Sequence, residues 1–306
     1  MKEQPSNNDR PVARPGEPIT GPLFIDHALS ARLESIEAEQ LAGLVRAVSA
    51  RLPERRAASL SIAGGVAAYI GPSVSTSRAA GLGMSGPVED ADVAALVDFY
   101  RSRGMAARIL VSPFADQSLF ARLGEHGFRL SGLDTILVRP LGLARAETPF
   151  SDAPAPGVSV RVATHGDAAT WVEASLSGFG AWRPPGSPEA PASEARAAAF
   201  HAAFEASFAD AAITYWMGSV AGVIAGAAAL HLRGGAGYFF AASTLEAHRG
   251  RGVQRALILA RLQAARDAGC DLAFTGTAPG GASQRNFERL GFVPAYSQAL
   301  LQRAFA

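Results

Sequence analysis

The chain has 306 residues, of which 48% are apolar and 18% are charged, and its formal net charge is +1. At about 100–200 residues per domain, this length favours two domains, each with enough apolar material for a core. Near-neutral charge gives no reason to expect a nucleic-acid or membrane-surface partner, and no run of about 18 apolar residues predicts a membrane span. Cys270 is the only cysteine, which excludes a disulfide framework and a cysteine-rich metal site. We therefore expect no metal and a reducing, cytoplasmic location.

Two proline-rich stretches divide the chain. Residues 1–17 are polar, lack the apolar core of a signal peptide and are predicted to form a flexible tail. A second polar stretch with three prolines, from Ala146 to Gly157, indicates a linker. The predicted domains are therefore 18–148 and 149–306.

Four elements are predicted in the first domain. A helix over 90–102 stops at Gly104, and a strand follows over 107–111. A second helix ends at His126, directly before Gly127-Phe128, and a strand covers 135–139.

The second domain begins with a predicted strand over 158–162, a helix from about Asp167 and a loop over 179–193. An alanine-rich helix then runs to about Ser207. Strands over 213–217, 223–232 and 238–244 follow, and the turns predicted at Gly218-Ser219 and Gly234-Gly235 suggest antiparallel hairpins. A helix over 253–268, a strand over 272–277, a short helix over 283–290 and a strand over 295–303 complete the chain.

The end of the second domain repeats the pattern of the first. Gly104 and the Gly-Phe pair at Gly127 are 23 positions apart, and Gly269 and the Gly-Phe pair at Gly291 are 22 apart. Two tandem domains of one fold explain this match, and chance similarity of short α/β segments is the alternative.

The most informative segment is the glycine loop between the strand over 238–244 and the helix over 253–268. Glycine residues let backbone amides converge on one point, and the helix presents its own amides and positive dipole end there. This combination favours a diphosphate, and Arg249, Arg251 and Arg255 add positive charge. A P-loop would need Gly-Lys-Ser or Gly-Lys-Thr at its end, and this loop has neither. A dinucleotide-binding fold would need a third glycine at the position of Arg255. Both nucleotide-binding alternatives therefore fit poorly.

The loop resembles that of the GNAT superfamily of acetyltransferases, which reads Arg or Gln, two residues, Gly, one residue, then Gly or Ala. Arg249, Gly252 and Gln254 occupy these places, although Gln254 departs from the usual small residue. The element order and the ending Asn286-Phe287-Glu288-Arg289-Leu290-Gly291-Phe292 are similar as well. The resemblance implies an α/β (α+β) fold, with two tandem GNAT-like domains, each a mixed, mostly antiparallel sheet flanked by helices.

The resemblance also implies a site for acetyl-CoA as acyl donor. The backbone of Ala242, Ser243 and Thr244 would pair with the pantetheine arm. The amides that would hold the pyrophosphate belong to Arg249, Gly250, Arg251, Gly252, Val253 and Gln254. Ser283 and Asn286 stand where the family often contacts the distal part of acetyl-CoA, and a helix N-cap and an exposed helix residue are the alternatives.

The first domain lacks such a loop. The equivalent position, Gly86 to Asp92, contains Pro87 and three acidic residues, which would repel a diphosphate. We expect one acetyl-CoA site per chain, with the first domain completing the acceptor site or the scaffold.

Proton transfer is harder to assign. Phe287 stands where many family members have a tyrosine that protonates the leaving thiolate, so Tyr296 is the candidate acid and His231 the candidate base. Core roles are the alternative for both. Phe179, Trp182, Tyr215 and Trp216 are candidates for the acceptor pocket or for the core.

The sequence therefore predicts an N-acetyltransferase that acts on an unidentified amine, as a monomer or homodimer. The alternative is a non-catalytic acyl-CoA-binding sensor, which the absence of a strand carboxylate and of a tyrosine at Phe287 keeps open.

Overall fold

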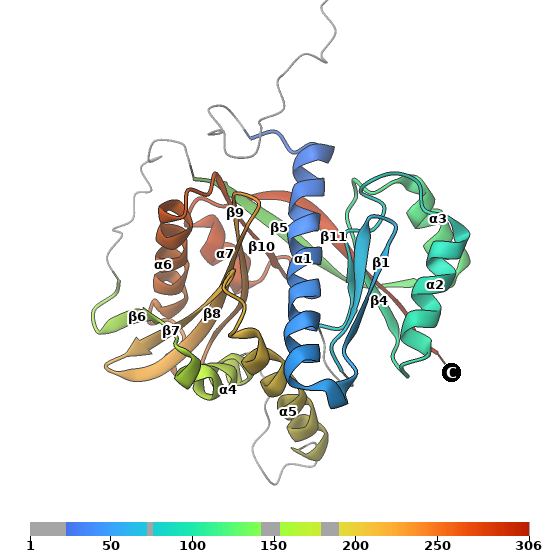
Figure 1. Cartoon of the computed structure of the whole chain (residues 1–306). Helices are drawn as coiled ribbons and strands as arrows, with labels where there is room; N and C mark the ends of the chain where they lie inside the picture. Colours follow the sequence, from blue (N-terminus) through green and yellow to red (C-terminus); the bar gives the residue numbers. More distant parts are fainter. Residues whose placement is uncertain (1–22, 72–75, 142–153, 179–189, 306) are drawn as a thin grey trace, which may run out of the picture.

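The computed structural model describes residues 23–71, 76–141, 154–178 and 190–305. Their backbone forms one 11-stranded mixed sheet with helices packed against it (Figure 1). The strands are β1 (Ala58–Ile62), β2 (Gly65–Tyr69), β3 (Ala79–Ala80), β4 (Ala107–Val111), β5 (Arg129–Pro140), β6 (Val158–Val162), β7 (Ile213–Val220), β8 (Val223–Arg233), β9 (Ala236–Thr244), β10 (Leu272–Thr277) and β11 (Val293–Arg303). The α-helices are α1 (His27–Arg51), α2 (Asp90–Arg101), α3 (Gln117–Glu125), α4 (Ala168–Gly178), α5 (Ala190–Ser207), α6 (Val253–Asp267) and α7 (Ala282–Glu288).

The sheet exchanges strands between the two halves of the chain. Its order is β1-β2-β3-β4-β11-β5-β10-β9-β8-β7-β6. The last strand of the first half, β5, pairs with β10 of the second half, and the last strand of the second half, β11, pairs with β4 of the first. Since β5 and β11 also pair with each other, the two tandem units share one continuous sheet.

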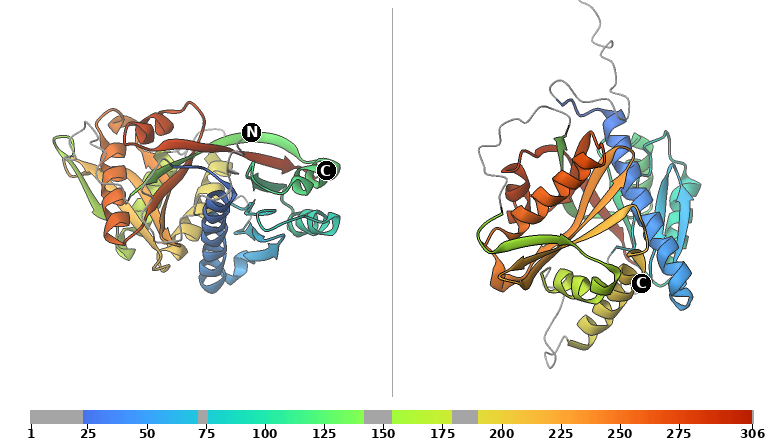
Figure 2. Two further views of the ribbon diagram at one scale, coloured as in Figure 1. Left: turned by 90° about the horizontal axis from the view of Figure 1, so that it is seen from above. Right: turned by 60° about the vertical axis from the view of Figure 1, so that its left-hand side comes forward.

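Helix α1 belongs to the first half in sequence but packs across strands of the second (Figures 1 and 2). It begins after the N-cap Asp26, whose carboxylate accepts from the Leu29 amide at 2.8 Å. Leu33 and Ile36 pack in one core with residues of β5, β9, β10 and β11. Polar contacts strengthen this docking, because the Arg32 guanidinium donates to Asp271 at 3.0 Å and to the carbonyl of Gly234. The sequence did not predict this helix.

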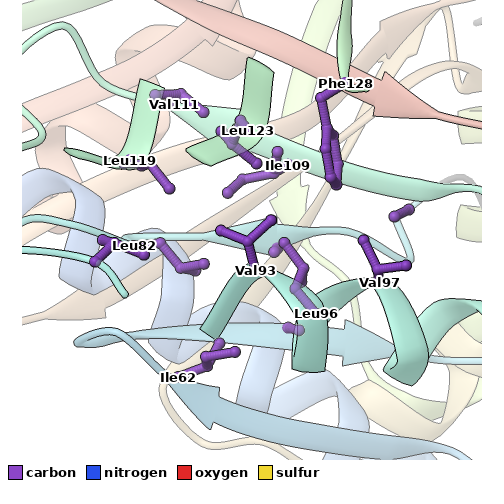
Figure 3. Close-up of a cluster of buried hydrophobic side chains, with 14 of the residues drawn as sticks. Ile62, Leu82, Val93, Leu96, Val97, Ile109, Val111, Leu119, Leu123 and Phe128 are labelled. Atoms are coloured by element: carbon purple, nitrogen blue, oxygen red, sulfur yellow. The ribbon is translucent and has the colours of Figure 1, made fainter. Parts of the chain in front are cut away.

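The remaining helices close separate cores. Helices α2 and α3 cover β1, β2 and β4, as Figure 3 shows for Val93, Leu96, Ile109 and Leu119. Helices α6 and α7 pack on β5, β8, β9 and β10 from the side opposite α1. Helices α4 and α5 pack on β7 and β8. No helix in the described part of the chain is long and apolar enough to cross a membrane.

Most predicted elements of the second half lie within three residues of their observed bounds, and two details differ. Gly218 and Ser219 lie inside β7, and the chain reverses at Ala221-Gly222 instead. Helix α5 begins at Ala190, so the last residues of the predicted loop over 179–193 are helical. The rest of that loop, 179–189, lies outside the described residues. The predicted tail and most of the linker also lie outside them, so the domain boundaries stay predictions.

Candidate functional site

Strand β9 separates from its parallel neighbour β10 near the middle of the sheet. The two strands pair only where Leu272–Phe274 face Ala236–Tyr238. On the other side, the register with β8 shifts between Ala227 and Ala229, which places a β-bulge at Ala241. Ala241 has φ +47°, a left-handed conformation that is uncommon for a residue with a side chain and often marks a functional site.

Two side chains from opposite sides of the sheet hold the β8 carbonyls beside this bulge. The indole of Trp171, on α4, donates to the carbonyl of Ala228 at 3.1 Å. The guanidinium of Arg261, on α6, donates to the carbonyl of Ala229 at 2.9 Å. These two contacts therefore fix the backbone beside the bulge. Because the Arg261 guanidinium is buried, its pKa is lowered to about 9.

The glycine loop continues from β9 to the start of α6. Gly250 and Gly252 have φ +76° and +83°, which only glycine adopts without strain. Gly252 is the N-cap of α6, and no side-chain cap hydrogen bond is made there by the part of the chain that the structure describes. The amides of the first turn are consequently available to an anion.

A cleft of about 570 Å³ opens between this loop, the end of β9 and α7; we call it the loop cleft. Most of the predicted site residues line it, namely Ala242, Ser243, Thr244, Arg249, Gly250, Gly252, Val253, Gln254, Ser283 and Asn286. Arg251 is exposed and is not among the lining residues. Lining residues that the sequence reading did not assign to the site are Gly178, His248, Ala282, Arg289 and Leu290.

Gln254 links the two helices that border the cleft. Its side-chain oxygen accepts from the amide of Asn286 at 2.7 Å, and its nitrogen donates to the Ser283 hydroxyl at 3.1 Å. Gly281 is the N-cap of α7, so Ser283 is not the helix cap that the alternative proposed. The unusual glutamine of the loop thus orders Ser283 and Asn286 at the cleft wall.

The polar groups of the loop cleft suit an anionic, hydrogen-bonding ligand. Arg249, Arg255 and Arg289 line it. The buried Thr244 hydroxyl and His248 Nδ1 have no hydrogen-bond partner among the described residues. Because buried polar groups normally have partners, these two atoms favour a bound polar molecule.

The start of α2, at the equivalent place in the first half, is arranged differently. The Asp92 carboxylate accepts from the Glu89 amide at 3.0 Å, and the Val88 amide donates to the Ser118 hydroxyl at 2.7 Å. These amides are therefore engaged by the chain's own side chains.

A further cavity of about 440 Å³ lies on the other side of the Ala241 bulge, where the two halves meet; we call it the junction cavity. It is lined by Glu37, Gln40, Leu41, Thr76, Arg78, Asp134, Ile136, Leu176, Phe200, Phe204, Tyr238, Phe239, Phe240, Ala241, Gly276 and Gln298. Ala241 lines the junction cavity and its neighbour Ala242 lines the loop cleft, so the bulge borders both spaces.

Tyr296, the predicted acid, lines neither space. Its hydroxyl donates to the carboxylate of Glu34, on α1, at 2.9 Å. Burial, with a smaller contribution from Glu34, raises the pKa of Tyr296 well above its ordinary value. The geometry therefore favours a role in holding Glu34 over the predicted role as proton donor to a thiolate.

His231, the predicted base, also lies outside both linings. It is 4% exposed on β8, opposite Ile213 of β7 and Tyr238 of β9. Burial lowers its pKa, so its imidazole is neutral near pH 7. Carboxylates in the junction cavity come instead from Glu37 of α1 and Asp134 of β5. The sequence alone does not predict this, because both elements belong to the first half of the chain.

Of the four aromatic candidates for the acceptor pocket, two pack in the hydrophobic cores and two lie outside the described residues. Tyr215 is buried and shares a hydrogen bond of 2.5 Å with the Ser207 hydroxyl, and Trp216 packs against two cores. Phe179 and Trp182 lie outside the described residues. Phe287 is 1% exposed and packs edge-on against Phe292.

Comparison with known proteins agrees with this geometry. Residues 180–292 match the Acetyltransferase (GNAT) family. A GCN5-related N-acetyltransferase from Kribbella flavida superposes with a TM-score of 0.59 at 20% identity, over 91% of this chain and 96% of that one. A tandem GNAT protein from the clavulanic acid biosynthesis pathway superposes with a TM-score of 0.52 at 17% identity, over 70% of this chain and 68% of that one. No curated protein sequence matches the chain.

The fold is that of GNAT proteins with two tandem units. Within the chain, residues 180–292 match the acetyltransferase (GNAT) family. The predicted fold class is thereby confirmed, and the family supports acyl transfer from acetyl-CoA as the general activity.

Proposed function

We propose that the chain transfers an acetyl group from acetyl-CoA, bound in the loop cleft, to the nitrogen of an amine. The observation that carries this proposal is that the Ala241 bulge borders both the loop cleft and the junction cavity. One side offers uncapped helix amides and arginines for a diphosphate, and the other offers carboxylates for an amine.

The donor site would act mainly by positioning. The backbone of Ala242–Thr244 would pair with the pantetheine arm, because β9 no longer pairs with β10 at that level. The amides at the start of α6 would hold the pyrophosphate. The thioester would then lie at the bulge, where a backbone amide can polarise its carbonyl.

The acceptor nitrogen would attack the thioester carbon after losing a proton. A carboxylate of the junction cavity would take this proton. The carbon–sulfur bond would then break, and the leaving CoA thiolate would be protonated by the proton that the nitrogen loses as the amide forms, directly or through water. Tyr296 and His231 contact neither space, so their predicted proton transfers would have to run through other groups.

The alternative, a non-catalytic acyl-CoA sensor, is not favoured. The carboxylates that the sequence of β9 lacks are supplied by Glu37 of α1 and Asp134 of β5, and the family match is to acetyltransferases.

Release of free thiol from acetyl-CoA in the presence of a panel of primary amines tests the proposal. We expect at least one amine to raise the rate well above that of the amine-free reaction. Acetyl-CoA binding without turnover across a broad panel would support the sensor instead.

A further inference from the structure

We propose that the junction cavity binds a compact primary amine with a single positive charge and an apolar body, and that Glu37 and Asp134 of the first half hold its nitrogen. This inference rests on the proposed acyl transfer and specifies its acceptor. It gives the first half, which has no glycine loop, a direct part in recognition.

The position of the cavity is the first support. Its wall includes Phe240 and Ala241 of β9, immediately before the residues that border the loop cleft. Beyond Tyr238, strand β9 no longer pairs with β10, so a nitrogen in the cavity can approach the bulge, where the thioester is expected, through the gap between these two strands. The volume of about 440 Å³ is in the range of small-molecule sites.

The charges of the wall favour a cation. The Glu37 carboxylate accepts from Arg78 at 2.8 Å, from Gln298 at 3.2 Å and from the Tyr238 hydroxyl at 3.4 Å. Asp134 adds a second carboxylate on β5, opposite Gln298 in the register. Two carboxylates and one guanidinium leave an excess of one negative charge, which matches one ammonium group.

Two wall atoms lack partners. The Arg78 Nε and the Thr76 hydroxyl are buried and form no hydrogen bond with the described residues. Both residues line the cavity, and buried polar atoms without partners favour a nearby ligand or ordered water.

The rest of the wall is apolar and aromatic. Phe200 and Phe204 of α5 stack with ring centroids 4.1 Å apart, and Tyr238 and Phe240 of β9 stack at 5.4 Å. Such rings favour an apolar body and also attract a nearby ammonium group. A doubly charged amine would lack a carboxylate for its second ammonium group, because Arg78 already balances one of the two carboxylates.

Calorimetric or NMR titration of the full chain with 2-phenylethylamine tests the inference, with 2-phenylethanol as the neutral comparator and 1,4-diaminobutane as the doubly charged one. We expect the amine to bind at least about tenfold more tightly than the alcohol, as a hydrogen bond to a charged group implies. We expect the diamine to bind more weakly than 2-phenylethylamine.

Glu37→Gln and Asp134→Asn should each weaken amine binding by at least about tenfold for the same reason. Glu39→Gln is the matched control, because Glu39 is on the same helix but is 48% exposed and pairs with Arg233. Asp134→Asn also serves where Glu37→Gln fails to fold.

Equal binding of alcohol and amine, no detectable amine binding, or equal binding by parent and Asp134→Asn proteins would overturn the inference. Acetyl-CoA titration of the same proteins separates this failure from that of the proposed function. A chain that binds acetyl-CoA but ignores these carboxylates contradicts only the acceptor site, whereas one that binds the amine but not acetyl-CoA contradicts the acyl transfer.

Discussion

Glu34 is a buried carboxyl group that accepts hydrogen bonds from neutral donors. The Tyr296 hydroxyl lies 2.9 Å from Oε1, and the Gln298 amide lies 3.0 Å from each oxygen. Burial, followed by the nearby charge of Glu37, raises the pKa of Glu34 from 4.5 to about 8. At a pH between these two values, Glu34 is therefore protonated in the folded protein and ionised in the unfolded chain.

This pKa predicts a specific dependence of stability on pH. Between pH 4.5 and about 8, the folded state binds one more proton at Glu34 than the unfolded state. The contribution of Glu34 to the free energy of unfolding therefore falls as pH rises, by at most about 1.4 kcal/mol per pH unit, and levels off above pH 8.

Glu34→Gln should remove this contribution, because glutamine is neutral in both states and its oxygen still accepts from Tyr296. Urea unfolding from pH 5 to 9 should show the variant gaining stability relative to the parent up to about pH 8. Glu39→Gln, at an exposed position of the same helix, should follow the parent curve. Parallel curves for Glu34→Gln and the parent would show that Glu34 is ionised in the folded state.

The loop between β9 and α6 is the element on which the donor site depends. Gly252 has φ +83° at the N-cap of α6 and lines the loop cleft. Gly222, in the turn between β7 and β8, has the same φ but an added Cβ would meet no atom within 4 Å there. The two glycines thus share a left-handed φ that would strain a valine, but a Cβ at Gly252 would also lie 3.1 Å from the Cβ of Ala155.

Gly252→Val should lower the affinity for acetyl-CoA by at least about tenfold, because its side chain would keep the pyrophosphate from the helix amides. Gly222→Val should leave that affinity unchanged while it carries the same conformational strain. Calorimetric titration measures both, with circular dichroism to confirm folding. A folded Gly252→Val protein with the parental affinity would refute the donor site.

These elements also show what a single sequence can predict. Helix α6 and strand β10 were found within a residue of their bounds because helical periodicity and the glycine at Gly269 are local signals. Helix α1 was missed because its buried sides carry Glu34, Glu37 and Gln40, which interrupt the apolar pattern. The loop cleft is predictable because most of its residues belong to the glycine loop and α7, which are adjacent or close in sequence. The junction cavity is not, because its residues come from both halves of the chain.

At the scale of the whole molecule, strand exchange makes the halves interdependent. Leu137 of β5 packs in the core under α6, and Leu33 of α1 packs in a core with Tyr238 of β9. No local pattern encodes the pairing of β5 with β10 or of β11 with β4, since these strands are distant in sequence. The tandem repeat was readable, but the shared sheet that brings Glu37 to β9 was not.

The two halves differ most at their equivalent helix starts. The α6 amides have no side-chain cap, whereas Asp92 and Ser118 engage amides at the start of α2. Acidic residues at α2 would also repel a diphosphate. The molecule should therefore bind acetyl-CoA through its second half alone.

Calorimetric titration of the full chain with acetyl-CoA tests this central claim most directly. We predict a single site per chain, which Gly252→Val weakens and Gly222→Val leaves intact. Two equivalent sites per chain, or no binding at all, would contradict the account.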